Sequence, residues 1–421
     1  MSLRRHIFSY SAANMVNAAL PFLLLPLLTS YLSPGDYGKL SLVQLLMSLS
    51  FPFILLNIHS LFVLEYSKLS PAEFGRFVSS MVWIPLGAFA FLELLFILFH
   101  SPLSAAFKIP SEWVLCVPLF ALMQSIPTML PVIFQAKKEP LNYTKFKISL
   151  TLANFAFTLV FIVSLGMGWE GRILGIAAAY ALFSLVGLAV LRSLGYLELY
   201  VSRDTLKEAL RFGIPLLPHT LAGILLAMSD KLFLANMMGV HEVGLYSVAF
   251  QVAGGILIVM TSVNQAWMPH LYEQLNASPS VRTKILIVGQ TYKVALAMAA
   301  FTLVFIALVP LVYRFFIGEN YQGGVVLSQV LSVAFLLQGF YFIVTNYIFY
   351  VKKTYLLSIV TTLSLLLLWG LNYFFILRYG VIGSAYALVC GYGTIFILGW
   401  ILAHRLYPMP WIFWRNHERH I

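Results

Sequence analysis

The chain has 421 residues, of which 61% are hydrophobic and only 10% charged, with a formal net charge of +11. Soluble domains carry about 25% charged residues, and the mean hydropathy of +0.89 excludes an ordinary cytosolic enzyme. Apolar runs recur along the whole length, and about 20 such residues suffice to cross a bilayer as a helix. The sequence therefore predicts an all-α polytopic membrane protein.

In chain order, the apolar runs predict twelve transmembrane helices. Their expected ranges are 7–32, 40–63, 77–99, 113–135, 148–166, 173–195, 209–238, 241–269, 290–313, 326–350, 355–377 and 381–404. The first run is too long for the core of a signal peptide and is interpreted as a retained span. The connections are short, so we expect no soluble domain between the spans.

The distribution of positive charge predicts the orientation of the chain. With a cytoplasmic N-terminus, twenty of the 26 Lys and Arg residues fall in inner segments, five fall in outer segments, and Lys231 lies within a span. This bias follows the positive-inside rule and places both termini in the cytoplasm. The net charge thus reflects topology, and we expect no nucleic-acid partner. Cys116 and Cys390 both lie in spans, so no disulfide framework is predicted.

Three sequence echoes indicate an internal duplication. "LSPGDYGKLSLV" from Leu32 is echoed by "MGVHEVGLYSVA" from Met238 at an offset of 206, and "AYAL" from Ala179 recurs at the same offset. "IFQAKK" from Ile133 returns as "IFYVKK" from Ile348 at an offset of 215. We expect two six-helix lobes, residues 1–200 and 201–421. An even number of spans per half gives a parallel repeat around a central cavity, as in alternating-access transporters.

Polar residues share one face of several spans, as judged from 100° per residue. They include Tyr10, Asn14 and Asn17 in the first span; Ser41, Gln44, Ser48, Pro52 and His59 in the second; Gln124, Thr128, Pro131 and Gln135 in the fourth; Arg211, His219 and Asp230 in the seventh; and Ser247, Gln251, Thr261 and Gln265 in the eighth. Such residues can simply join helices in membranes. Stripes on the first two spans of both halves favour a shared hydrophilic cavity.

Ionisable residues within spans are costly and are candidates for function. This set contains His59, Glu93, His219, Asp230 and Lys231. Lys231 has an alternative role, because its long side chain can reach the membrane interface. His59 can equally be a core histidine, and Glu93 can belong to a structural pair. The sequence contains no Ser/His/Asp or paired-carboxylate arrangement, so no enzyme, metal site or cofactor is predicted.

The stretches "NAALPFLLLPLLTSYLSPGDYGKLSL" from Asn17 and "SDKLFLANMMGVHEVGLYSVA" from Ser229 resemble the bacterial O-antigen flippases. These are polysaccharide-biosynthesis members of the multidrug/oligosaccharidyl-lipid/polysaccharide exporter superfamily. The resemblance implies that the chain moves an undecaprenyl-diphosphate-linked oligosaccharide across the bacterial inner membrane by alternating access. It also implies a setting with a polysaccharide polymerase and a chain-length regulator.

With that cargo, the candidate residues divide by role. Basic residues at the inner face would receive the diphosphate, as Lys and Arg do for anionic lipid heads: Arg4, Arg5, Arg76, Lys137, Lys138, Lys352 and Lys353. The cavity would be lined by Tyr10, Asn14, Asn17, Gln44, His59, Arg211, His219, Lys231, Gln251 and Gln265. Titration of His59, Asp230 or Glu93 would couple transport to a proton or cation gradient.

Three alternatives stay open from the sequence. The inner basic residues can serve topology alone. An ion-coupled multidrug antiporter of the same superfamily would share the fold, and it would be expected to have a more acidic cavity. A membrane-embedded glycan polymerase or ligase would be an enzyme, but such proteins usually carry a substantial outer loop, whereas the outer loops here are short.

Overall fold

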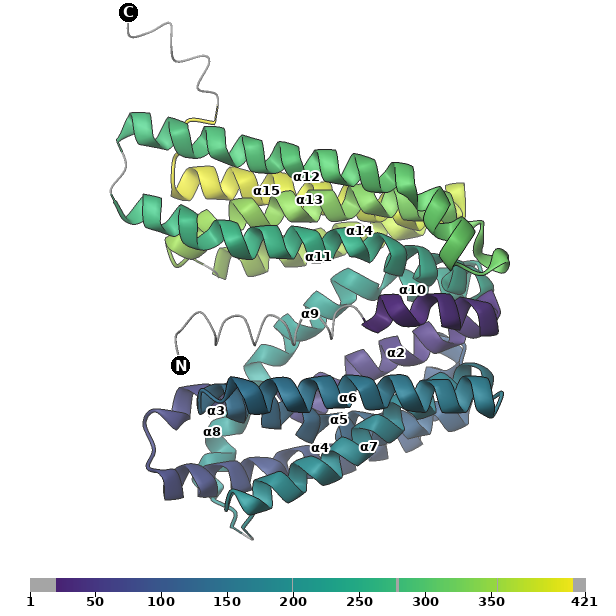
Figure 1. Cartoon of the computed structure of the whole chain (residues 1–421), viewed down its shortest axis with the longest axis vertical. Helices are drawn as coiled ribbons and strands as arrows, with labels where there is room; N and C mark the ends of the chain where they lie inside the picture. Colours follow the sequence, from purple (N-terminus) through teal and green to yellow (C-terminus); the bar gives the residue numbers. More distant parts are fainter. Residues whose placement is uncertain (1–19, 199, 278–279, 354, 412–421) are drawn as a thin grey trace, which may run out of the picture. The chain divides into compact units, whose positions relative to one another are not determined.

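The computed structural model describes residues 20–198, 200–277, 280–353 and 355–411 (Figure 1). In these ranges all regular secondary structure is helical. Eleven helical stretches are long and apolar enough to cross a membrane. The first predicted span is described only from Leu20, and it forms a shorter apolar helix, Leu20–Tyr31. The predicted all-α polytopic fold with twelve spans is confirmed.

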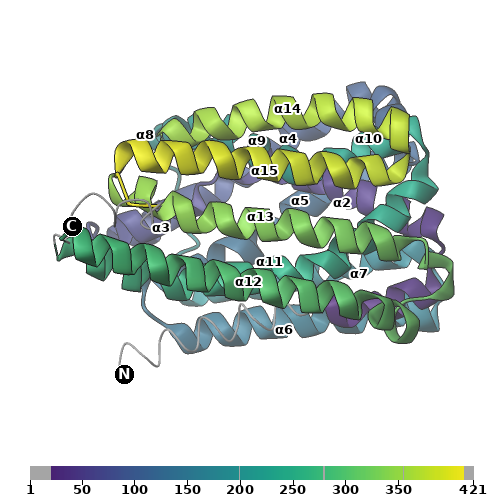
Figure 2. The ribbon, with the colours of Figure 1, turned by 90° about the horizontal axis from the view of Figure 1, so that it is seen from above.

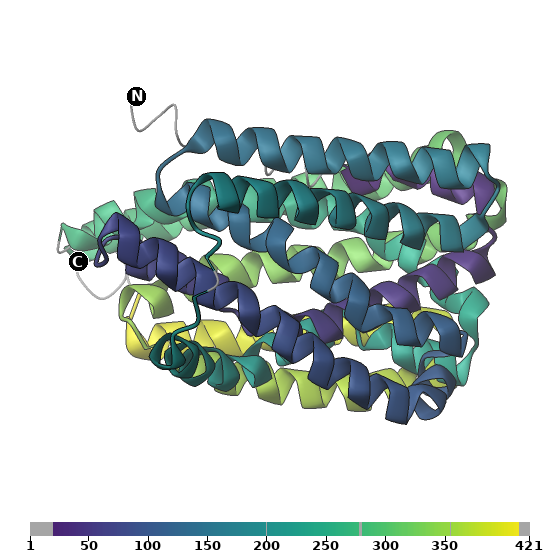
Figure 3. The same ribbon diagram turned by 90° about the horizontal axis from the view of Figure 1, so that it is seen from below.

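Two compact units make up the chain, Met1–Gly244 and Leu245–Ile421. The helices of the first unit are α2 (Pro34–Leu55), α3 (His59–Tyr66), α4 (Pro71–Phe107), α5 (Ser111–Ala136), α6 (Pro140–Leu159), the π-helical turn η1 (Val160–Ser164), α7 (Gly168–Ser193), α8 (Arg203–Gly213), η2 (Ile214–Leu216), α9 (Leu217–Met228) and α10 (Asp230–Met237). Helix α11 (Val240–Asn276) begins in this unit and continues into the second. Figure 3 shows the long helices of the first unit running side by side.

The second unit continues with α12 (Val281–Phe316), η3 (Glu319–Tyr321), α13 (Gly324–Tyr350), α14 (Tyr355–Tyr379) and α15 (Val381–Leu406). Helix α15 packs along both α13 and α14 (Figure 2). The lobe boundary expected at residue 200 stays a prediction. In the structure α8 packs on α4, and α9 packs on α2, so these helices belong to the first unit.

The second predicted span contains a break that shapes its surroundings. Pro52 lies inside α2, and the helix ends where Leu56 (φ 48°) and Asn57 (φ 53°) adopt left-handed backbone conformations. Gly213, at the end of α8, contacts this bend so closely that a Cβ there would overlap the carbonyl oxygen of Leu56. The Asn57 side chain donates a hydrogen bond to the Thr220 hydroxyl at 3.1 Å. The bend is therefore fixed to α8 and α9.

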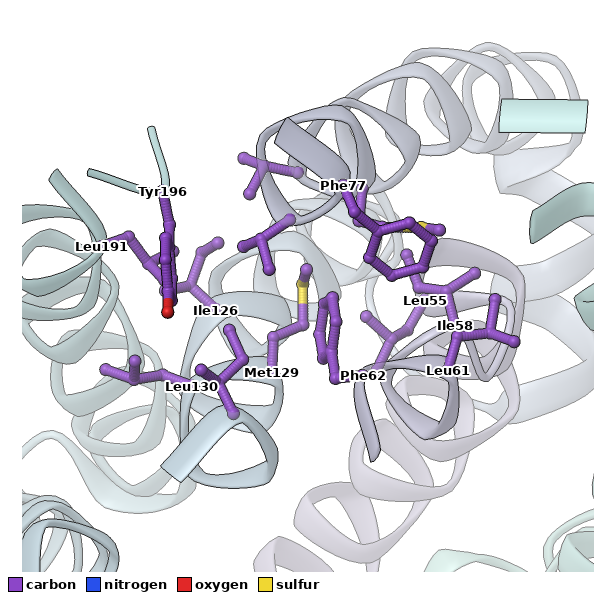
Figure 4. Close-up of a cluster of buried hydrophobic side chains, with 14 of the residues drawn as sticks. Leu55, Ile58, Leu61, Phe62, Phe77, Ile126, Met129, Leu130, Leu191 and Tyr196 are labelled. Atoms are coloured by element: carbon purple, nitrogen blue, oxygen red, sulfur yellow. The ribbon is translucent and has the colours of Figure 1, made fainter. Parts of the chain in front are cut away.

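A cluster of buried apolar side chains lies beside this bend (Figure 4). Leu55 and Phe62 from α2 and α3 contribute to it together with Phe77 of α4, Met129 of α5 and Leu191 of α7. Phe62 makes an edge-to-face contact with Phe77 at a ring-centroid distance of 6.2 Å. Between membrane helices such side chains stabilise the bundle through close van der Waals packing, because lipid tails are as apolar as the side chains themselves. The cluster holds the ends of α2, α4, α5 and α7 together.

The repeated stretches meet within the first unit. A Cβ added at Gly38 of α2 would overlap the carbonyl oxygen of Val240, and one added at Gly244 of α11 would overlap that of Pro34. Gly38 and Gly244 differ by 206 positions, and so do Pro34 and Val240. The contact is thus reciprocal between repeat-related residues. It requires glycine because two helix backbones approach where a side chain would stand.

Candidate functional site: a polar cavity beside an apolar groove

A cavity of about 520 Å³ lies in the first unit, between α2, α5, α7 and α9. Its lining residues are Gln44, Met47, Ser48, Phe51, Pro52, Leu55, Asn57, Gln124, Ile176, Tyr180, Thr220, Ile224 and Met228. None of them is charged. The size lies within the range of small-molecule sites, which are mostly apolar with a few placed polar groups.

The amides of the cavity are its main unused hydrogen-bonding groups. In the described part of the chain, the side chains of Gln44 and Gln124 form no hydrogen bond, and each amide offers two donors and an acceptor. The hydroxyls are already used in part: Ser48 donates to the Gln44 carbonyl oxygen at 2.8 Å, and Thr220 to the Leu216 carbonyl oxygen at 3.1 Å. This arrangement suits a neutral ligand with many hydroxyl groups.

An apolar groove of about 660 Å³ lies on the opposite side of the end of α2 from the cavity. It is lined by Phe53, Leu56, Trp83, Ile84, Gly87, Ala88, Phe91, Leu92, Leu95, Leu206, Leu210, Ile214 and Leu217, which include no charged, amide or hydroxyl side chain. At the end of α2, Pro52 and Leu55 line the cavity, whereas Phe53 and the following Leu56 line the groove. Residues one apart on a helix differ by 100° in direction. The end of α2 therefore separates a polar space from an apolar one.

The structure brings part of the predicted second-span stripe into this cavity. Gln44, Ser48 and Pro52 line it, and Gln124 of the fourth-span stripe joins them. His59 lies at the start of α3, beyond the bend, and is not among the lining residues. Its Nδ1 is buried, and no described residue forms a hydrogen bond with it. The bend redirects the chain after Leu55, which a helical projection of the span cannot anticipate.

Three polar lining residues were not among the sequence candidates. Asn57 follows the bend, Thr220 lies on α9, and Tyr180 lies on α7. Tyr180 belongs to the repeated "AYAL" motif, and that recurrence was the one sequence signal near it. Thr220 follows His219, which the sequence predicted to line the cavity but which is exposed. The helical projection was therefore wrong by one residue at this position.

The other cavity candidates lie elsewhere. Arg211 is exposed on α8, and Gln251 and Gln265 belong to the second unit. Lys231 of α10 is 6% exposed, which does not suit a side chain that reaches the interface. Tyr10, Asn14 and Asn17 lie outside the described residues, as do Arg4 and Arg5.

The ion-coupling candidates occupy separate positions. Asp230 is 2% exposed and accepts a hydrogen bond at 2.9 Å from the backbone amide of Lys231, where α9 passes into α10. Glu93 is partly buried on α4, with its Oε2 unpartnered in the described part of the chain. Neither residue lines the polar cavity. Their proposed role as titrating groups stays a prediction.

The basic candidates at the predicted inner face contact aromatic rings or project outward. Arg76 lies over the Tyr200 ring at 5.6 Å, and Lys137 lies over Tyr196 at 5.8 Å. Lys137 also pairs with Glu139 at 3.0 Å. Three further candidates are exposed: Lys138, Lys352 and Lys353. Burial raises the pKa of the Tyr196 phenol, and the positive charge of Lys137 opposes this shift.

Comparison with known proteins identifies the family of this chain. The model of the family described as "Polysaccharide biosynthesis protein" matches residues 3–274. The chain belongs to the polysaccharide biosynthesis protein family. A protein of the Lsg locus of Haemophilus influenzae is 24% identical to this family member over 373 residues, covering 84% of this chain and 86% of that one. An "Uncharacterized membrane protein" of the same organism is 24% identical over 375 residues, covering 88% and 89%.

Solved structures show the same fold. An inward-facing multidrug resistance MATE family transporter of the MOP superfamily superposes with a TM-score of 0.70 at 16% identity, covering 95% of this chain and 98% of that one. The outward-facing conformation gives a TM-score of 0.58, covering 96% of both chains. This polysaccharide biosynthesis protein therefore has the multi-pass fold of MOP-superfamily transporters.

Proposed function

We propose that this family member is a flippase for an undecaprenyl-diphosphate-linked oligosaccharide, an O-antigen or related repeat unit. It would work by alternating access in the bacterial inner membrane, with both termini in the cytoplasm. The observation that carries the proposal is the pairing of the polar cavity with the apolar groove across one wall. An amphipathic substrate needs both environments: amides and hydroxyls for its sugars, and an apolar surface for its isoprenoid tail.

Several features of the chain support this substrate. The chain belongs to a family of polysaccharide biosynthesis proteins. Lipid-linked sugars are the class of substrate that a transporter in such a process would carry. The cavity lining has no carboxylate, whereas a site for organic cations would gain affinity from acidic groups. In this proposal Arg76, Lys137, Lys138, Lys352 and Lys353 receive the diphosphate. Polysaccharide polymerase and chain-length regulator act on the product.

Coupling to a proton or cation gradient belongs to the same proposal. His59, Glu93 and Asp230 are the groups that would change charge during the cycle. A transport rate that is the same across a pH range and without any ion gradient would contradict this part. The flippase activity itself would then stand as uncoupled translocation.

The test is a reconstitution in liposomes containing a fluorescent undecaprenyl-diphosphate oligosaccharide. Accessibility to an impermeant glycosidase measures translocation for the wild type and for Gln124→Ala. We expect the variant to lower the rate by about tenfold, because one amide can supply hydrogen bonds worth roughly 1–1.5 kcal/mol. Gln135→Ala is the matched control, since Gln135 is an exposed amide on the same helix.

Two results would count against the proposal. If the folded wild type moves no lipid-linked oligosaccharide, the flippase assignment fails. Efflux of cationic dyes by the same preparation would then support the antiporter. If Gln124→Ala and Gln135→Ala behave alike, the cavity is not the sugar site.

A further inference from the structure

One buried cation of the first unit has no part in the site described above. Arg172 lies on α7 and is only 8% exposed. Burying a charged group is costly unless it is paired and fully hydrogen-bonded. The ion pairs within the described part of the chain do not involve Arg172. Within the described residues, its charge is therefore not neutralised by a carboxylate.

The groups that hold Arg172 are neutral. Its Nη1 donates to Asn154 Oδ1 at 2.5 Å and to Thr158 Oγ1 at 2.6 Å, both on α6. Thr158 in turn donates to the carbonyl oxygen of Asn154 at 2.7 Å. The Nε of Arg172 is buried and has no hydrogen-bond partner among the residues that the structure describes. These contacts fix the guanidinium in place and leave its charge and the buried Nε–H without a counterpart among the described residues.

The local backbone brings α6 and α7 together at this point (Figure 1). A Cβ added at Gly175 would come within 2.9–3.0 Å of Thr158 atoms, so glycine allows the close approach. Directly after α6 the chain forms the π-helical turn Val160–Ser164. Such turns are rare and frequently occur at functional sites. The arginine is thus held by a specifically built helix contact.

Arg172 is aligned with the polar cavity. Arg172, Ile176 and Tyr180 follow at intervals of four on α7, which places them on one face of the helix. Ile176 and Tyr180 line the cavity. Arg172 lies one turn further, about 6 Å along the axis. The cavity is therefore neutral along its walls and positively charged just beyond one end.

We infer that Arg172 is an anion-binding residue of this cavity and contacts the phosphate oxygens of the substrate. This inference rests on the proposed function and adds a site that discriminates a diphosphate from a monophosphate. The free Nε–H and the positive charge would bind a phosphate oxygen, while Asn154 and Thr158 keep hold of Nη1. Charge-assisted hydrogen bonds from a guanidinium to phosphate are the stronger kind.

Binding of two simple lipids to the purified full chain in detergent tests the inference. Undecaprenyl diphosphate and undecaprenyl monophosphate share a tail and differ by one phosphate. We expect the wild type to prefer the diphosphate by at least about tenfold, the effect of one hydrogen bond to a charged group. Arg172→Gln should lose this preference and retain the affinity for the monophosphate. Arg378→Gln is the control, because Arg378 is exposed and lies 206 positions later.

Two further variants separate anion binding from a structural role. Asn154→Ala removes an acceptor but keeps the cation, so we expect the diphosphate preference to persist. If Arg172 only joins α6 to α7, this variant should instead resemble Arg172→Gln. Thr158→Val frees part of the guanidinium, and we expect it to raise the affinity for the diphosphate about two- to fivefold. This variant decides the question should Arg172→Gln not fold.

The outcomes are distinct for the two proposals. A diphosphate preference that survives Arg172→Gln, or equal losses for both lipids, overturns the role of Arg172. Unchanged or weaker diphosphate binding by Thr158→Val does the same. Wild-type protein that binds with the expected preference but translocates nothing in liposomes overturns the flippase function and leaves the anion site in place.

Discussion

The first turns of α2 and α11 have remained alike, whereas the helices differ further along. At their beginnings, Gly38 and Gly244 pack reciprocally against the backbone of the other helix. One and a half turns or more beyond, Gln44 and Ser48 line a polar cavity, but their partners at the offset of 206 are Phe250 and Gly254. Phe250 packs edge-to-face on Phe335 at 5.1 Å. The duplicated sequence was kept where two backbones touch and changed where side chains line a cavity or pack in a core.

The two arginines at positions 172 and 378 make the same point. Both are separated by the offset of 206 that aligns the two "AYAL" motifs. Arg172 lies inside α7 and is buried, whereas Arg378 lies in the last turn of α14 and is exposed. Helix α7 begins at Gly168, well before its "AYAL" motif at Ala179, whereas α15 begins at Val381, just before its motif at Ala385. A shift in a helix boundary has given the same residue type two different environments.

The largest effect is expected from disrupting the close backbone contact at Gly38 and Gly244, the feature that the two halves share. Gly38→Ala and Gly244→Ala each place a methyl group against a carbonyl oxygen that cannot move without shifting a helix. Overpacking of this kind costs about 1–3 kcal/mol, and we expect a clear fall in the melting temperature of the protein in detergent. Gly223→Ala is the control, because a Cβ there meets nothing within 4 Å. Equal melting temperatures for all three variants would contradict the close crossing.

A smaller effect is expected from making the first half resemble the second. Gln44→Phe introduces the residue found at the repeat-related position 250. The larger apolar ring would occupy the polar cavity and remove an amide, so we expect the translocation rate to fall about tenfold or more with the fold intact. Full transport by a folded Gln44→Phe protein would show that the cavity is not on the substrate path.

The apolar groove gives a third, more selective expectation. Gly87 lies in the groove, and a Cβ there has open space around it. Gly87→Trp should fill part of the groove and weaken binding of lipids with long isoprenoid tails several-fold, with little effect on short-chain analogues. Gly370→Trp, at an exposed and equally open glycine of α14, is the control. The same loss for short and long tails would speak against tail binding in the groove.

The smallest effect concerns the two Lys–Lys turns. Lys138 and Lys352 each adopt a left-handed backbone conformation after a helix, with φ of 57° and 58°. Among the described residues, only the first of these turns has a carboxylate beside it, that of Glu139. Burial raises the pKa of Glu139, but hydrogen bonds from Asn142 and Lys137 and the charge of Lys137 lower it, and the net effect is a lowered pKa. Because the folded pKa is lowered, this contribution to stability is present above the unfolded pKa of about 4.3 and is lost as the pH falls through the folded value.

Glu139→Gln tests this contribution through the pH dependence of the melting temperature. We expect the difference from wild type to be present at neutral pH and to vanish in acid. Its size should stay below about 1 kcal/mol, because the pair is partly exposed to solvent. A difference that grows on acidification would have the wrong sign and would contradict the assignment.

Sequence patterns were sufficient for the membrane architecture and the duplication. The long apolar runs determine the spans because no other backbone structure satisfies its hydrogen bonds in lipid. The positive-inside bias predicts the orientation, and the echoes at Gly38 and Gly244 predicted a repeat. Helical projection also selected Gln44, Ser48 and Gln124, because polar faces have the period of the helix.

Only the tertiary structure decided which residues of those polar faces line the cavity. The left-handed Leu56 and Asn57 turn the chain away from the projected stripe, so His59 leaves the cavity and Asn57 enters it. The burial of Arg172 depends on Asn154, Thr158 and the glycine at 175, which come together only when α6 packs on α7. A span's sequence determines that it crosses the membrane, because that depends on its own composition. Which side chains share a cavity depends on the neighbours that packing supplies.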